Sequence, residues 1–202
     1  MFLPGVGADP DFWRPLGDRL PADWDKTYLG WPGLGAQPAD PAVNSYDDLI
    51  GLVLAAIRDG PVDLLAQSMG GALAMRIALD YPAKVRRLVL AVTSGGVDVE
   101  GLGGVDWRPS YRQSFPQALN WALSSRFDLT ERIPSLGHPV LLLFGDADPI
   151  APLAVGRRLA GLLPQAELHI TPGGGHDLVH THAAELAHLV ERHLGSGLSG
   201  NS

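Results

Sequence analysis

Short, continuous apolar runs alternate with longer amphipathic stretches along almost the whole sequence. The first apolar run ends at Leu3, and the other five span residues 24–29, 62–66, 87–92, 140–144 and 166–170. The amphipathic stretches span residues 11–20, 45–59, 69–80, 153–163 and 177–194. A strand that is apolar at every position belongs to a sheet that is covered on both faces. The alternation therefore predicts an α/β fold with a mostly parallel sheet of about six strands and helices on both faces.

One segment interrupts this alternation. Residues 94–137 begin Gly-rich and then carry several aromatic side chains, which predicts a small helical insertion that we call the lid. Residues 1–93 and 138–194 are expected to form the core around it. Residues 195–202 are rich in Gly and Ser, and we expect a disordered tail there.

Composition narrows the function classes. The formal charge of -7 and the lack of Lys/Arg clusters beyond two Arg pairs argue against nucleic acid as a partner. No apolar run approaches the roughly 20 residues that span a bilayer, and no signal peptide is recognised, so we expect no membrane partner and a cytoplasmic location. The absence of Cys excludes disulfides, thiolate zinc sites and cysteine nucleophiles.

A serine stands where the apolar run 62–66 meets the amphipathic stretch 69–80. Ala66 and Gly70, two positions on either side of Ser68, are small enough for the strained strand-to-helix turn that presents a nucleophilic hydroxyl. The helix that follows points its free N–H groups toward the place where an oxyanion would form. The alternative is that Ser68 only caps this helix.

Two further loops carry candidate partners of this serine. Asp146 and Asp148 follow the run 140–144, and His176 follows three glycines after the run 166–170. Because the carboxyl ends of parallel strands meet at one sheet edge, these side chains are expected to converge there. Alone, each loop is as well explained by an ordinary turn. The order Ser, Asp, His after successive strands indicates a hydrolytic triad.

Several motifs of this sequence resemble those of the α/β-hydrolase family, over nearly the whole chain. They are the nucleophile elbow at residues 66–70, the acid turn at 145–149, the histidine loop at 175–176, the oxyanion loop at 2–7 and a Gly-rich loop at 31–35. The resemblance implies Ser68 as nucleophile, His176 as general base and Asp148 as acid. Asp148 is preferred over Asp146 because the acid of the family usually stands three positions after the glycine.

The backbone N–H groups of Val6 and Met69 form the oxyanion hole that the resemblance implies. The implied activity is hydrolysis of a small-to-medium apolar carboxylic ester or thioester through an acyl-Ser68 intermediate. Such a small molecule is the expected partner, and no metal or organic cofactor is expected. Lactone hydrolysis, carbon–carbon bond cleavage, elimination and non-catalytic ligand binding stay open, because fold does not fix function.

Aromatic side chains of the lid are candidates for substrate binding or, alternatively, for packing against the core. They are Trp107, Tyr111, Phe115 and Trp121. The arginines of the lid either bind a substrate carboxylate or lie in solvent. They are Arg108, Arg112 and Arg126.

The family core has two strands before the oxyanion loop, whereas this sequence reaches that loop at once. Either the sheet is trimmed or upstream sequence is missing. A trimmed sheet would leave residues 24–29 as an exposed edge, which favours a homodimer.

Two other motifs do not hold. Residues 5–10 are similar to a dinucleotide-binding loop, but Pro10 replaces its third Gly. His176 and His180 have the spacing of helical zinc ligands, yet Asp177 stands where that motif has Glu.

Overall fold

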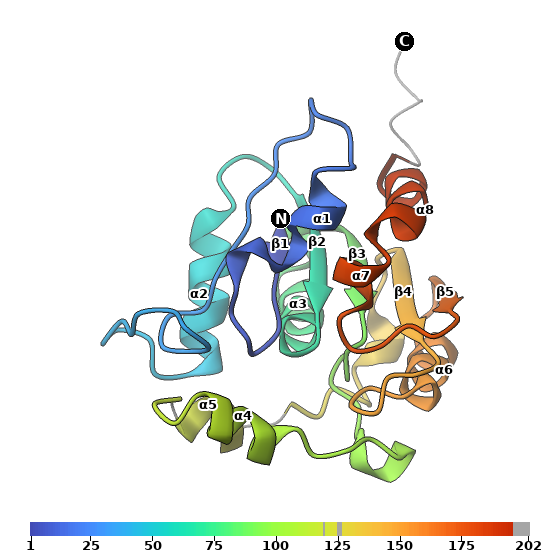
Figure 1. The fold of residues 1–202 in the computed structure, drawn as a ribbon. Helices are drawn as coiled ribbons and strands as arrows, with labels where there is room; N and C mark the ends of the chain where they lie inside the picture. The colour runs from blue at the N-terminus through green and yellow to red at the C-terminus, as the bar shows by residue number, and fades with distance from the viewer. Residues whose placement is uncertain (119, 125–126, 196–202) are drawn as a thin grey trace.

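A parallel sheet runs through the centre of the molecule (Figure 1). The computed structural model describes residues 1–118, 120–124 and 127–195, so most of the tail predicted at 195–202 lies outside the described residues. All neighbouring strands pair in parallel, in the order β1-β2-β3-β4-β5. They are β1 (Phe2–Leu3), β2 (Val62–Gln67), β3 (Val85–Ala91), β4 (Val140–Gly145) and β5 (Ala166–Thr171).

Helices cover both faces of this sheet. They are α1 (Arg14–Gly17), α2 (Tyr46–Ala56), α3 (Met69–Asp80), α6 (Leu153–Leu162), α7 (Leu178–Thr181) and α8 (Ala183–Gly195), with short 3-10 turns η1 (Pro10–Trp13) and η2 (Pro82–Lys84). The helices α2, α3 and α6 connect consecutive parallel strands, and right-handed crossovers put them on one face. On the other face α1 packs against α8. The predicted α/β architecture is confirmed.

The pattern of burial explains why β4 and the central positions of β2 and β3 are apolar. All six residues of β4 are buried, and the central positions of β2 and β3, such as Leu64 and Leu88, are fully buried. Each such leucine contributes about 1.5–3 kcal/mol relative to an exposed one. At the edge, β5 is mostly half-buried.

Helix ends follow local side-chain chemistry. The Ser45 hydroxyl accepts a hydrogen bond from Asp48 N at 3.2 Å and begins α2, as an N-cap serine does. The stretch 177–194, predicted as one helix, is divided into α7 and α8 at His182. Just before the break, the Thr181 hydroxyl donates to Asp177 O at 3.3 Å, and this back-bonding bends helices.

Residues 24–29 do not form the strand that their pattern predicts. Only Tyr28 makes a bridge to Phe2, and Phe2 N donates to Thr27 O at 2.8 Å. The partner strand β1 has only two residues, and Pro4, which follows it, has no N–H to extend the ladder. The sheet therefore has five strands and this single bridge, against about six expected. A homodimer through this edge stays a prediction.

The chain between β3 and β4, which contains the lid, is helical. It holds η3 (Glu100–Leu102), α4 (Arg108–Ser114), α5 (Asn120–Ser124) and η4 (Ile133–Ser135). Figure 1 shows α4 and α5 beneath α2 and α3, apart from the sheet. Within the described residues, no helix is both long enough and apolar enough to span a bilayer.

Stability is expected to fall in mild acid because of His193. This half-buried side chain of α8 contacts Leu88 O at 3.0 Å through Nε2, and burial, which disfavours the charged imidazole, lowers the pKa of His193. The unfolded chain therefore takes up this proton at a higher pH than the folded one. The stabilisation is complete above the unfolded pKa of about 6.5 and is lost as the pH falls through the lower pKa of the folded state.

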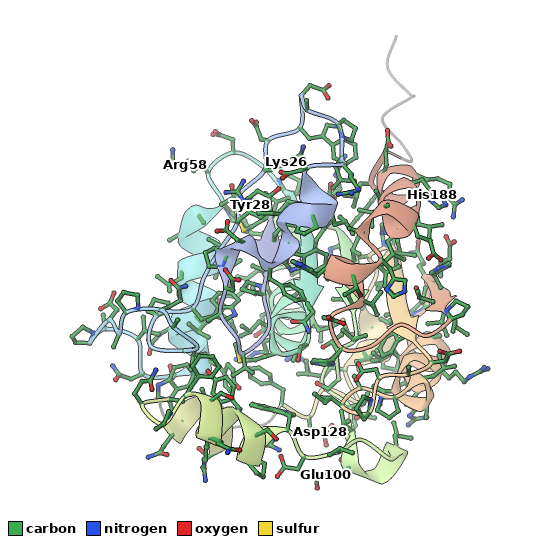
Figure 2. The ribbon with its side chains drawn as sticks, in the orientation of Figure 1. Lys26, Tyr28, Arg58, Glu100, Asp128 and His188 are labelled. Atoms are coloured by element: carbon green, nitrogen blue, oxygen red, sulfur yellow. The ribbon has the colours of Figure 1, made fainter. Side chains whose placement is uncertain are left out.

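We expect His193→Gln to reduce the loss of unfolding free energy between about pH 7 and about pH 5, because a Gln amide donates to Leu88 O without titrating. Urea denaturation at each pH measures this. The matched control is His188→Gln, since Figure 2 shows His188 on α8 pointing away from the protein body, and it is exposed. Identical pH slopes for His193→Gln and the unsubstituted protein would contradict the prediction.

Candidate active site

Ser68 occupies the sharp turn between β2 and α3. Its backbone has φ 53° and ψ -120°, a conformation that costs a non-Gly residue about 1–3 kcal/mol. A Cβ at Gly70 would lie 2.5 Å from Pro4 O and 2.8 Å from Leu3 O, so only glycine fits there. The Ser68 hydroxyl makes no cap bond to α3, which makes the helix-cap alternative wrong.

The hydroxyl of Ser68 instead begins a chain of hydrogen bonds. His176 Nε2 lies 2.9 Å from Ser68 Oγ, and His176 Nδ1 lies 2.8 Å from Asp148 Oδ2. The side chain of Asp148 is fully buried, and its Oδ1 accepts from Ile150 N at 2.8 Å and Ala151 N at 3.2 Å. Because a carboxylate only accepts, Nδ1 carries the ring proton and Nε2 is free to accept from the serine.

The two candidate carboxylates have different surroundings. Asp148 contacts His176, whereas Asp146 is exposed and accepts from Gly173 N at 2.6 Å. Beside it, a Cβ at Gly145 would lie 1.9 Å from Gly174 O, so the turn after β4 and the loop after β5 are in direct contact. Asp146 thus ties together the two loops that bring Asp148 to His176.

Val6 and Met69 each line a cavity that Ser68 also lines. Met69 is the first residue of α3, and a Cβ at Gly5 would lie 3.0 Å from Ser68 Cβ, so the loop at residues 2–7 closely approaches the serine. We keep the name oxyanion loop for residues 2–7, as the resemblance gives it. Neither Val6 N–H nor Met69 N–H has a hydrogen-bond partner in the part of the chain that the structure describes. Both N–H groups are thus available as hydrogen-bond donors.

Two cavities meet at Ser68 and His176. The first has a volume of about 320 Å³ and extends toward the lid, with Trp107 and Tyr46 in its wall. The second, of about 300 Å³, lies along the oxyanion loop and Phe12. A bound molecule can therefore occupy space on either side of the serine.

Only Trp107, of the four lid aromatics predicted to bind substrate, lines a cavity that contains Ser68. Tyr111 is buried and bonds the backbone, and Phe115 packs on the Tyr111 ring at 5.0 Å. Trp121 packs edge-on against Tyr46 at 5.4 Å. For these three residues the alternative of lid packing fits the structure, because aromatic rings of short helices bury their area against the core.

Carboxylates dominate the charge at the lid end of the first cavity. Asp98, Glu100, Asp106 and Asp128 line it, and Figure 2 shows Glu100 and Asp128 at the lower edge of the molecule. The guanidinium of Arg108 also lines it but pairs with Asp106 at 2.8 Å. Arg112 is exposed, and Arg126 lies outside the described residues. Within the described residues, no group of three or more His, Asp or Glu has an arrangement that would hold a metal ion.

The sequence motifs did not identify two buried polar residues of the site. Gln67 Nε2 donates to His176 O at 3.0 Å, and Thr93 Oγ1 donates to Ser68 O at 2.6 Å. Both stand at the carboxyl ends of apolar strands. A polar side chain at the carboxyl end of an apolar strand could have indicated them in the sequence, because a buried polar group needs a hydrogen-bond partner.

A comparison with sequence families shows to which family the chain belongs. The model of the "Alpha/beta hydrolase family" matches residues 1–189, so the protein belongs to that family. A poly(3-hydroxyalkanoate) depolymerase from Ectopseudomonas oleovorans is 28% identical over 236 residues, which cover 96% of this chain and 83% of that protein.

Two further similarities agree with this family. A pimeloyl-[acyl-carrier protein] methyl ester esterase from Neisseria meningitidis serogroup B / serotype 15 (strain H44/76) is 27% identical over 239 residues, covering 96% of this chain and 92% of the esterase. The structure of a meta-cleavage product hydrolase from Pseudomonas fluorescens IP01 shares the fold with a TM-score of 0.74 and 19% identity, over 96% of this chain and 89% of that one.

The contact between His176 and Asp148 is testable by NMR. A short, charge-assisted hydrogen bond strongly deshields its proton. We expect a far-downfield ¹H signal from His176 Nδ1–H that is lost in Asp148→Asn and kept in Asp146→Asn. Survival of the signal in Asp148→Asn would show that the ring bonds elsewhere.

Proposed function

We propose that the protein is a serine hydrolase that cleaves small-to-medium apolar carboxylic esters or thioesters. The observation that carries the proposal is the unbroken hydrogen-bonded chain from Ser68 through His176 to Asp148. The N–H groups of Val6 and Met69, which line cavities that Ser68 also lines, support an oxyanion site. The names of the relatives, a poly(3-hydroxyalkanoate) depolymerase and a methyl ester esterase, favour ester chemistry.

In the proposed mechanism Ser68 Oγ attacks the carbonyl carbon while His176 Nε2 takes its proton. Asp148 keeps the imidazole in the required tautomer and stabilises its cation. The tetrahedral adduct collapses, its bond to the alcohol or thiol breaks, and His176 returns the proton to that leaving group. Water, deprotonated by the same imidazole, then attacks the acyl-Ser68. The bond from the acyl carbon to Ser68 Oγ breaks, His176 returns the proton to Ser68 Oγ, and the carboxylic acid leaves.

The oxyanion of each tetrahedral adduct would bind to Val6 N–H and Met69 N–H. Both are backbone groups, so they are held in place before the reaction, and the dipole of α3 adds positive potential at Met69. One donor of this kind contributes about 3–4 kcal/mol to transition-state stabilisation.

The charge around the first cavity favours an uncharged acyl group. Apolar side chains such as Val97 and Ile150 line the cavity. The carboxylates at its lid end would repel a carboxylate on the acyl chain of a substrate. Arg108 offers little compensation, because Asp106 already pairs with it. A substrate with a free carboxylate on its acyl chain should therefore bind poorly.

Covalent labelling tests the nucleophile. A fluorophosphonate should label the unsubstituted protein and fail to label Ser68→Ala or His176→Ala, because the label reports an activated hydroxyl. Asp148→Asn should reduce ester turnover by about 10⁴, through the wrong tautomer, while Asp146→Asn should retain most of it. Hydrolysis of p-nitrophenyl butyrate measures turnover. Equal hydrolysis by the unsubstituted protein and Ser68→Ala would eliminate the proposal.

Esters of graded length and charge test the substrate class. We expect kcat/KM for neutral p-nitrophenyl esters to exceed that for a hemisuccinate ester by at least about tenfold at low salt, with the gap narrowing at high salt as charges are screened. Glu100→Gln combined with Asp128→Asn should further reduce the difference in kcat/KM between the neutral and the anionic esters. Equal rates for neutral and anionic esters would exclude this charge selectivity, and labelling without ester turnover would favour lactone or carbon–carbon bond cleavage.

A further inference from the structure

One lid side chain reaches the oxyanion loop. Tyr111, in α4, donates its hydroxyl proton to Val6 O at 2.9 Å and accepts from Gly35 N at 2.7 Å. The ring is buried, and burial raises the pKa of Tyr111, so the hydroxyl keeps its proton. Tyr111 is therefore a direct contact between the lid and the oxyanion loop.

The bond to Val6 O completes the fixation of the backbone around Val6. On the preceding side, Gly5 O accepts from Ala8 N at 3.0 Å, which fixes the peptide plane that carries Val6 N–H. In a trans peptide the N–H points opposite to the C=O, so this bond also sets the direction of Val6 N–H. On the following side, Tyr111 fixes the peptide plane that carries Val6 O. Both planes that meet at Val6 are thus held.

The hydroxyl of Tyr111 is itself oriented. A Cβ at Gly35 would lie 1.9 Å from Gly7 O, so the loop at Gly35 packs directly on the oxyanion loop. A tyrosine hydroxyl has one proton to donate, and accepting from Gly35 N turns that proton toward Val6 O. Such consecutive hydrogen bonds strengthen one another in a buried setting.

We propose that Tyr111 is a positioning residue: by holding Val6 O, it fixes the central peptide of the turn at residues 5–8, and the Gly5 O–Ala8 N hydrogen bond of this turn directs Val6 N–H toward the oxyanion. This inference rests on the proposed function, in which Val6 is an oxyanion donor. It makes the efficiency of the chemical step depend on a hydroxyl in the lid that does not itself touch substrate. The competing role for Tyr111 is anchoring of the lid, which would alter the shape of the substrate cavity instead.

Kinetics of Tyr111→Phe separate these two roles. The substitution removes one oxygen and keeps the ring that packs on Phe115. A misdirected oxyanion donor weakens only the tetrahedral state, so we expect kcat for p-nitrophenyl butyrate to fall by about tenfold while KM stays within about twofold. The inhibition constant of butylboronic acid, whose adduct with serine is tetrahedral, should rise by a similar factor.

Gln117→Ala is the matched control. Gln117, also in the lid, donates to Gly35 O at 3.4 Å and makes no described contact with the oxyanion loop. Removing this lid contact should leave kcat and boronate affinity unchanged. As a second variant, 4-aminophenylalanine in place of Tyr111 keeps a donor near Val6 O and should restore much of the lost kcat. Thermal unfolding checks that each variant folds.

Three outcomes would overturn the inference. The first is a rise in KM with unchanged kcat in Tyr111→Phe. The second is a loss of kcat in Gln117→Ala as large as that in Tyr111→Phe. The third is an unchanged boronate affinity in Tyr111→Phe. Failure of the proposed function looks different, because the unsubstituted protein would then match Ser68→Ala in ester hydrolysis. If the unsubstituted protein hydrolyses the ester and Tyr111→Phe has the same kcat, only the positioning role of Tyr111 is wrong.

Discussion

The contact between the turn after β4 and the loop after β5 is the constraint on which the site depends. A Cβ at Gly145 would lie 1.9 Å from Gly174 O, so position 145 tolerates no side chain. This approach brings the fully buried carboxylate of Asp148 to the imidazole of His176. The parallel register of β4 and β5 makes it possible, because strands that run in one direction deliver both loops to one edge.

Hydrogen bonds from three buried side chains hold the backbone of the site. Thr93 holds Ser68 O, Gln67 holds His176 O, and Tyr111 holds Val6 O. Each bond satisfies a carbonyl that would otherwise be costly to bury, and each fixes a loop that carries proposed chemistry. The strain at Ser68, at about 1–3 kcal/mol, persists because this surrounding structure determines the turn.

The first cavity combines apolar side chains in its wall with carboxylates at its lid end. Trp107 lines the cavity, and its binding of substrate stays a prediction, while Tyr111, Phe115 and Trp121 pack within the lid or against the core. The lid thereby shapes the cavity, supplies its charge and reaches the oxyanion loop through Tyr111. One short insertion therefore links the proposed selection of a substrate to the proposed stabilisation of its transition state.

The sequence by itself determined the parallel sheet and the Ser68 turn, because continuous apolar runs and small residues at Ala66 and Gly70 are local patterns with few solutions. It did not decide that residues 24–29 stop short of a strand, since that depends on the length of β1. The resemblance already preferred Asp148 over Asp146, but only the tertiary structure places its carboxylate in contact with His176 and the Tyr111 hydroxyl in contact with Val6 O. These bonds join residues 28 and 105 positions apart, and side-chain direction in a fold is set by packing across elements, which no local pattern encodes.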